Sequence, residues 1–402
     1  MSRSSAIVIG AGLAGLVAAD ELAQAEVEVT VIEARERVGG RTWSRELANG
    51  ALVEMGAEFV LPQNTEVTAL ASELGLGLWA KGMRYGEREP RGGIGTSADE
   101  LAAAFADVRR ALERLEGRPS ARALLDSLAI GPGAREAILA RVEISSAAAA
   151  EEIPATNLAG LAQIGAESAP SVAGGNQGLA LGLAARLGAA VRLGDAAVEV
   201  DRRADSVVVR TASGRDYEAD RCVIAVPASV SERIDFRPGL PRATREALVR
   251  VSYGHAAKLF VPLSEPAPPS AVMSVPERYW CWTATGAGDR PTPLVSCFAG
   301  SPGALERLQV TAGAGRWLES LAVLRPDLAL EPAGALLSTW DEDPWVGAAY
   351  SIPPEPELTA ALAEPVGPLA FAGEHLGGPY AALMEGAVRS GRAAARRLLG
   401  RL

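Results

Sequence analysis

Residues 5–42 read SAIVIGAGLAGLVAADELAQAEVEVTVIEARERVGGRT and decide the fold. The stretch opens with a short apolar run, Ala6 to Ile9, which is typical of a buried parallel strand. Three glycines follow at GxGxxG spacing. A helix-like stretch from Leu13 to Ala25 and a second strand-like stretch from Val27 to Ile32 come next. This order predicts a βαβ unit that binds a dinucleotide.

Each glycine has a separate role in such a unit. Gly10 permits the tight turn, Gly12 lets the backbone approach a pyrophosphate, and Gly15 lets helix and strand pack closely. The phosphates would lie at the helix N-terminus near Ala14, where free N–H groups favour anions. Glu33 ends the second strand, where a carboxylate accepts hydrogen bonds from a ribose diol and disfavours the 2′-phosphate of NADP. The alternative is a structural turn that binds nothing, because glycines also close ordinary turns.

The segment after the second strand is longer than a bare turn and carries a glycine pair flanked by arginines. A solvated loop and a second phosphate-contacting segment both fit this pattern. Further on, Gly56 interrupts a predicted strand over Val53–Val60, and a glycine inside a strand often marks close approach of a ligand or another backbone. The candidate cofactor contacts in these two segments are Ala34, Arg35, Gly39, Gly40, Arg41, Gly56, Ala57 and Glu58.

The bulk composition limits the function classes. A chain of 402 residues usually forms two domains. Its net charge of −10 would repel a phosphate backbone, so we expect no nucleic-acid partner. Three unpatterned cysteines and two histidines give neither a disulfide framework nor a metal site. We see no leader and no run of the ~18–20 apolar residues that span a bilayer. We therefore expect a soluble cytoplasmic protein without a membrane anchor.

Lysine is rare in this chain: of 39 lysines and arginines, only Lys81 and Lys258 are lysines. Lys258 lies in a predicted strand, Tyr253–Pro262, in phase with Ala256 and Phe260 rather than with a polar face. A lysine in such a segment is costly to bury, so it needs hydrogen-bond partners or a function. The alternative is a side chain that reaches the surface.

The remaining sequence contains a block of helical patterns followed by a block of mainly strand patterns. A capping box, Ser97 to Glu100, opens a helical block that runs to about Leu161. Strand patterns then return, and a buried strand, Leu369–His375, ends in Gly-Glu-His. A predicted helix over Ala382–Leu399 follows this strand. The strand, glycine, acid and helix repeat the order of the first residues, so we expect the chain to end beside its beginning.

These blocks resemble the flavin-dependent amine oxidases, a family that includes monoamine, polyamine and L-amino-acid oxidases. The matching motifs occur in the family's order: IVIGAGLAGLVAADEL, VIEARERVGGRT, GAEFVLPQNTEV, GGNQGLALGLAARLG, VIAVPASV, YGHAAKLFV, WDEDPWVGAAYS, FAGEH and MEGAVRSGRAAA. The resemblance implies an α/β fold with a discontinuous Rossmann-like FAD-binding domain and a second, α+β substrate domain. It also implies oxidation of an amine C–N bond to an imine, then an aldehyde or ketone, with oxygen reduced to hydrogen peroxide.

On this resemblance, residues 1–62, 172–235 and 365–402 would form the FAD-binding domain, and residues 63–171 and 236–364 the substrate domain. The expected partners are a small amine and molecular oxygen. The sequence does not determine the oligomeric state, with a homodimer among the options.

The resemblance also assigns individual residues. Val198 would contact adenine through its backbone. Gly373 and Glu374 would meet the ribityl chain and pyrophosphate, and Met384 would start a helix under the isoalloxazine. Lys258 would hold a water near flavin N5 and assist reoxidation.

Departures from the family pattern narrow the expectations. Ala349 stands where covalently flavinylated members carry cysteine, so we expect non-covalent FAD. Tyr350 matches one wall of an aromatic cage around the substrate amine, but the facing wall is Leu383, and Tyr380 is the nearby residue that could compensate.

No arginine follows Gly56, where some L-amino-acid oxidases clamp the substrate carboxylate. This argues against an α-amino acid unless another arginine, such as Arg84, replaces it. An L-amino-acid oxidase therefore stays an alternative. So do a protoporphyrinogen- or carotenoid-type enzyme and a flavin-binding module without catalysis.

Overall fold

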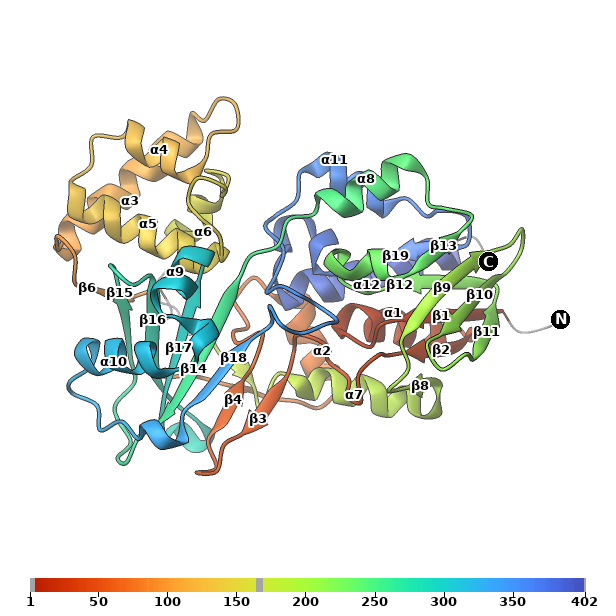
Figure 1. Cartoon of the computed structure of the whole chain (residues 1–402), viewed down its shortest axis with the longest axis horizontal. Coiled ribbons are helices and arrows are strands. Elements are labelled where there is room, and N and C mark those ends of the chain that lie inside the picture. The colour runs from red at the N-terminus through yellow and green to blue at the C-terminus, as the bar shows by residue number, and fades with distance from the viewer. Residues whose placement is uncertain (1–3, 85, 164–168, 401–402) are drawn as a thin grey trace.

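A computed structural model describes residues 4–84, 86–163 and 169–400. A five-stranded parallel sheet, which we call the first sheet, organises one half of the molecule (Figure 1). Its strand order is β19-β12-β1-β2-β8. The bounds are Ser5–Ile9 for β1, Glu28–Ile32 for β2, Val191–Arg192 for β8, Arg221–Ile224 for β12 and Leu369–Phe371 for β19.

Helices cover one face of the first sheet. Ala6 and Val8 of β1 point toward this face, while Ile7 and Ile9 point toward the other, as the two-residue period of a strand requires. Gly391 lets the last helix approach the first closely, because a Cβ there would lie 2.4 Å from the carbonyl oxygen of Ala14. The chain therefore ends beside its beginning, as predicted. The packed helices are α1 (Leu13–Gln24), α2 (Thr65–Glu73), α7 (Gln177–Leu187) and α12 (Met384–Leu399).

The opposite face of the first sheet packs against a four-stranded sheet of order β11-β10-β9-β13 and against two helices. The bounds are Ala197–Arg202 for β9, Val207–Thr211 for β10, Asp216–Ala219 for β11, Asp235–Arg237 for β13, Arg242–Arg250 for α8 and Pro356–Ala363 for α11. The predicted domain ranges place α2, α8 and α11 with the substrate domain, whereas they pack on the first sheet. An apolar helix stripe shows that a helix is amphipathic but not which core it joins.

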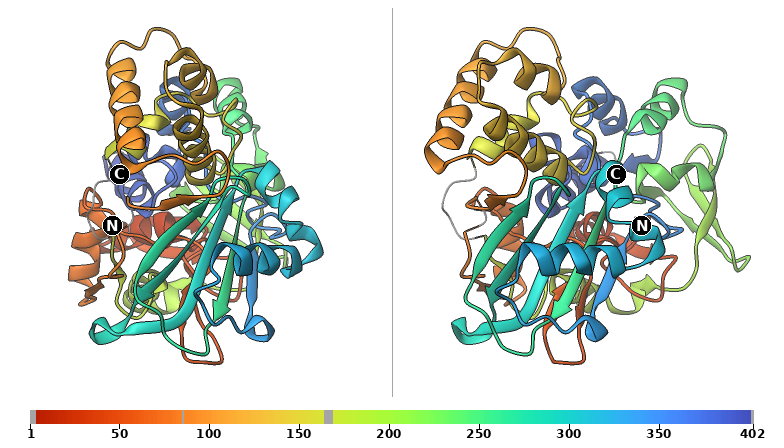
Figure 2. Two further views of the ribbon diagram at one scale, coloured as in Figure 1. Left: turned by 90° about the vertical axis from the view of Figure 1, so that its left-hand side faces the viewer. Right: turned by 60° about the vertical axis from the view of Figure 1, so that its left-hand side comes forward.

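The other half of the molecule is built on a six-stranded sheet of order β18-β14-β17-β16-β15-β6. Helices α9 (Pro302–Arg307) and α10 (Gly315–Leu324) pack on its outer face (Figure 2). The strands are β6 (Glu89–Arg91), β14 (Ala256–Pro262), β15 (Ser270–Ser274), β16 (Tyr279–Thr285), β17 (Pro291–Gly300) and β18 (Leu336–Thr339). None of the helices in the described part of the chain is long and apolar enough to cross a bilayer.

A helical block lies at one end of this sheet and has a core of its own (Figure 1). The capping box is confirmed, because Ser97 and Glu100 exchange both hydrogen bonds at the start of the first helix. The block contains α3 (Ala98–Glu113), α4 (Ala121–Ser127), α5 (Pro132–Ser146) and α6 (Asn157–Gln163).

Several predicted boundaries were wrong: the strand predicted over Leu369–His375 ends at Phe371, and the strand predicted over Tyr253–Pro262 begins at Ala256. Two further differences have a local cause. The strand predicted over Val53–Val60 ends as β4 (Leu52–Glu54), paired with β3 (Ser44–Glu46). After it the chain passes against another backbone, since a Cβ on Gly56 would lie 1.7 Å from the carbonyl oxygen of Arg41. The last helix begins at Met384 rather than Ala382, because Ala382 has a φ of 70° and cannot be helical.

Candidate active site

One elongated cavity of about 340 Å³ lies where the carboxyl ends of the first sheet face the six-stranded sheet. The residues that follow β1, β2, β12 and β19 all line it, and these include Gly10, Glu33, Pro227 and Gly373. The chain runs from β1 to β2 on one side, whereas β12 lies on the other. The cavity therefore opens at a topological switch point, the usual ligand site of such sheets.

The glycines of the first turn have different environments. Gly10 has a φ of 102°, which favours glycine. A Cβ on Gly15 would lie 2.0 Å from the carbonyl oxygen of Gly10, so Gly15 serves packing and does not line the cavity. A Cβ on Gly12 would meet nothing within 4 Å. Gly12 therefore presents bare backbone to the cavity, as close approach of a pyrophosphate requires.

Glu33 holds this turn to the second strand. Its carboxylate accepts hydrogen bonds from the backbone N–H of Ala11 at 2.8 Å and of Arg35 at 2.9 Å. A carboxylate has about four acceptor positions, so two stay available for a ribose diol. Gly39 donates its N–H to the carbonyl oxygen of Ala11 at 2.9 Å, which places the glycine-pair segment directly beside the turn.

Two helix N-termini also face the cavity. Gly12 precedes α1 and Leu383 precedes α12, and neither helix has a side chain that caps its first N–H groups. Gly12, Leu383 and Met384 all line the cavity. Each N-terminus therefore offers N–H donors and a positive dipole end to an electron-rich ligand group.

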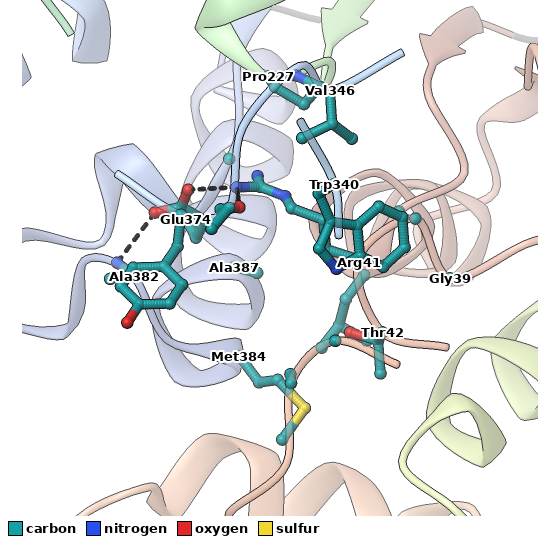
Figure 3. A pocket seen from close by; sticks show the side chains of 18 of the residues that line it. Gly39, Arg41, Thr42, Pro227, Trp340, Val346, Glu374, Ala382, Met384 and Ala387 are labelled. Carbon is teal, nitrogen blue, oxygen red and sulfur yellow. Dashed lines mark hydrogen bonds and ion pairs between the residues drawn. The ribbon is translucent and has the colours of Figure 1, made fainter. Parts of the chain in front are cut away.

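An ion pair ties the beginning of the chain to its end. Arg41 Nη1 lies 2.8 Å from Glu374 Oε1 and donates to the carbonyl oxygen of Ala349 at 2.8 Å (Figure 3). Glu374 also accepts a hydrogen bond from the Ala382 backbone at 2.9 Å. Burial opposes ionisation of Glu374, but Arg41 and hydrogen bonds from Ser351 hold its pKa below the ordinary value. Glu374 is therefore a buried, charged anchor of the cavity wall.

Both lysines of the chain meet on one carboxylate. Lys258 Nζ lies 2.8 Å from Glu58 Oε2 and donates to the carbonyl oxygen of Glu54 at 2.8 Å. Lys81 Nζ lies 3.0 Å from Glu58 Oε1. Lys258 is 5% exposed, so the surface-reaching alternative was wrong. Burial opposes ionisation of Glu58, but Lys258 and Lys81 hold its pKa below the ordinary value.

The six-stranded sheet supplies the floor of the other end of the cavity. Lys258, Phe298 and Trp280 are direct partners on β14, β17 and β16, so their side chains form a row on one face. Trp280 stacks on Trp282 at 4.2 Å between ring centroids. The guanidinium of Arg88 lies 3.8 Å from the centroid of the Trp280 ring. The cavity thus joins a dinucleotide-type site to a buried aromatic chamber with one lysine and one arginine.

Comparison with known proteins shows the family to which this chain belongs. The family model for flavin-containing amine oxidoreductases matches residues 13–160 and 157–399. The chain belongs to this family. It is a flavin-dependent amine oxidase, and FAD is its cofactor.

Individual relatives of this amine oxidase span nearly its whole length. Flavin-containing amine oxidase B of Mus musculus is 25% identical over 99% of this chain and 86% of its own. An L-amino acid dehydrogenase of Synechocystis sp. is 25% identical over 100% of this chain and 96% of its own. The solved structure of putrescine oxidase bound to putrescine has a TM-score of 0.81 at 25% identity and covers 100% of both chains.

The structure brings most of the predicted amine oxidase residues to the cavity. Tyr350 and Leu383 both line it, and the Tyr350 hydroxyl donates to the carbonyl oxygen of Ser145 at 3.0 Å. The cavity is also lined by Gly10, Gly12, Ala14, Glu33, Ala34, Arg35, Gly39, Gly40, Arg41, Gly56, Ala57, Glu58, Lys258, Gly373, Glu374 and Met384.

Besides Gly15, three residues named from the sequence lie outside the cavity lining. Val198 is exposed and is not among the lining residues, whereas the preceding residues Ala196 and Ala197 are. Its backbone contact with adenine stays a prediction. The Tyr380 ring lies against the guanidinium of Arg389 at 4.3 Å and is not among the described lining residues, so this position does not support a role as the second cage wall.

Arg84 is also outside the cavity: it is exposed and pairs with Glu87. Sequence reasoning missed Arg88 and the aromatic chamber. Two tryptophans at the two-residue spacing of a strand, Trp280 and Trp282, were the available signal.

We expect FAD to bind in this cavity without a covalent bond. Ala349 lines the cavity, and it stands at the position where covalently flavinylated members of the family carry a cysteine. Among the described lining residues there is neither a cysteine nor a histidine. His375 is buried behind the wall, and burial lowers its pKa to about 4, so it is neutral near pH 7.

We therefore expect acid precipitation of the FAD-loaded protein to release all of its flavin. Neither a cysteine nor a histidine lines the described cavity wall, and alanine stands at position 349, so we expect unfolding to remove every contact that holds the cofactor. The measurement is the absorbance of the supernatant and pellet after precipitation. Yellow colour that stays with the pellet would show a covalent bond.

Proposed function

We propose that this enzyme oxidises a small amine at its C–N bond, with oxygen as the electron acceptor and hydrogen peroxide as a product. The observation that carries the proposal is the position of Lys258 in the floor of an aromatic chamber continuous with the dinucleotide site. When bound, FAD would supply the acceptor for a hydride from the amine's α-carbon and the carrier of its electrons to oxygen.

The chain's own groups bind, orient and protect the substrate. The amine would lie between Tyr350 and Leu383, and the rings of Trp280, Trp282 and Phe298 would exclude water around it. The chamber offers no histidine as a base among its described residues. The amine therefore reacts in its neutral form, which the nearby ammonium of Lys258 also favours by repelling a second cation.

Lys258 has one donor to spare for the reaction. An ammonium carries three N–H donors, and Glu58 and the Glu54 carbonyl take two of them. The third can hold a water molecule at the cavity floor. Because Glu58 holds Lys258 Nζ in place, this donor lies next to the site where electrons would pass to oxygen, and it would stabilise the negative charge that oxygen gains.

An aerobic amine panel tests this proposal by measuring oxygen consumed and peroxide formed. We expect one peroxide for each amine oxidised with at least one member of an aryl-alkyl, cyclic, polyamine and amino-acid series. Amine-dependent reduction of an artificial dye without oxygen consumption would instead show a dehydrogenase and contradict the oxidase proposal.

A further inference from the structure

The charges on the cavity wall bear on whether the substrate can carry a second ammonium group. Among the described lining residues the carboxylates are Glu33, Glu58 and Glu374. Glu33 accepts two backbone N–H groups, and Glu374 pairs with Arg41. Glu58 already holds both lysines of the chain. None of the three is left to pair with the second ammonium of a diamine.

The aromatic chamber contains a cationic side chain, the guanidinium of Arg88. Arg88 lies just before β6 and is 5% exposed. Its guanidinium lies over Trp280, and both residues line the cavity. Stacking on the ring fixes the plane of the guanidinium, and a fixed planar fork of N–H donors suits a carboxylate.

The strand register gives the scale of this chamber. Lys258, Phe298 and Trp280 lie on three successive strands at one level of the sheet. Strands are spaced about 4.8 Å apart, so Lys258 and Trp280 are roughly 10 Å apart at the backbone. The carboxyl group of an α-amino acid lies next to its amine. A carboxylate separated from the amine by a ring or a chain spans the chamber better.

We propose that the substrate is an amine that carries a remote carboxylate, with the carboxylate bound by Arg88. The spacer lies over Phe298 and Trp280, and the amine lies between Tyr350 and Leu383. This inference rests on the proposed amine oxidation and names its substrate class. It separates this enzyme from one selective for diamines, because Arg88 and Lys258 would repel a second ammonium.

Matched substrates test the inference. We compare 2-phenylethylamine with 4-(2-aminoethyl)benzoate, and hexylamine with 6-aminohexanoate and 1,6-diaminohexane, using anaerobic flavin reduction. The carboxylated member of each set should have a kcat/KM higher by about tenfold or more, and the diamine should be the poorest. Phenylalanine should be a weaker substrate than 4-(2-aminoethyl)benzoate.

Variants of two arginines on the same segment provide the control. Arg88→Met should abolish the preference for the carboxylated amine, and Arg88→Lys should restore part of it. Arg84→Met should leave the preference unchanged, because Arg84 is exposed and outside the cavity lining. Thermal melts of each variant show that the fold is retained.

Direct binding gives a readout independent of turnover. Titration with 4-phenylbutyrate should quench tryptophan fluorescence, and Arg88→Met should weaken its binding by about tenfold or more. If uncharged amines reduce the flavin as well as their carboxylated partners, and Arg88→Met changes neither reduction nor binding, the inference is overturned while amine oxidation stands. If the carboxylate binds through Arg88 but no amine reduces the flavin, the anion site stands and the proposed function fails.

Discussion

Lys258→Met is expected to slow oxidation of the reduced flavin by oxygen by more than about tenfold, which corresponds to a barrier increase above ~1.4 kcal/mol. Methionine keeps an apolar side chain of similar length but removes the charge and the third N–H donor. Glu58 keeps one partner, since Lys81 still pairs with it. The reductive step should change less, because the amine binds at Tyr350 and Leu383 rather than on the lysine.

Stopped-flow mixing of the pre-reduced enzyme with oxygen measures this rate directly. Lys81→Met is the matched control. It removes the other lysine from the same carboxylate but leaves the group that lines the cavity, so we expect a much smaller change. Equal oxygen kinetics in the wild type and Lys258→Met would reject the role given to Lys258. Equal slowing in both variants would assign the effect to Glu58.

The second large effect is expected at the adenine end. Glu33→Ala should weaken FAD binding by about tenfold or more, because it removes the predicted ribose acceptor and leaves the N–H groups of Ala11 and Arg35 without their carboxylate. Losing a partner costs a buried donor about 1–3 kcal/mol. The apoprotein should therefore also unfold at a lower temperature.

The flavin-to-protein ratio after gel filtration measures retention, and a fluorescence titration gives the dissociation constant. Glu36→Ala is the matched control, because Glu36 is exposed on the same segment and does not line the cavity. A Glu33→Ala protein that stays fully loaded would mean that the ribose contact lies elsewhere. Lower thermal stability with unchanged FAD affinity would assign Glu33 to folding alone.

The parts of this molecule predicted best were those encoded locally. The GxGxxG turn and the capping box at Ser97 depend on residues close in sequence, and the structure has both as expected. Glu33 lies at the end of the second strand and lines the cavity, as its place in the sequence predicted, and its ribose contact stays a prediction. The burial of Lys258 was also predictable, since a lone lysine in an apolar strand stands out against an arginine-rich background.

The parts that escaped prediction depend on how distant segments meet. Glu58 was assigned to the cofactor, and only the tertiary structure shows that Lys81 and Lys258 converge on it. Arg88 reaches Trp280 because β6 pairs with β15 and β15 with β16, a strand order that no local pattern specifies. Tyr380 was near the cage in sequence, but its ring packs against a guanidinium. The short sequence distance between Tyr380 and Leu383 therefore did not show whether Tyr380 lines the cavity.

The most direct test of amine oxidation is anaerobic titration of the FAD-loaded protein with amines, followed by the visible absorbance of the flavin. The account predicts that at least one amine bleaches the flavin fully, that an amine bearing a remote carboxylate does so fastest, and that admitting oxygen restores the yellow colour. A flavin that no amine bleaches, in a protein that is folded and fully loaded, would contradict the account.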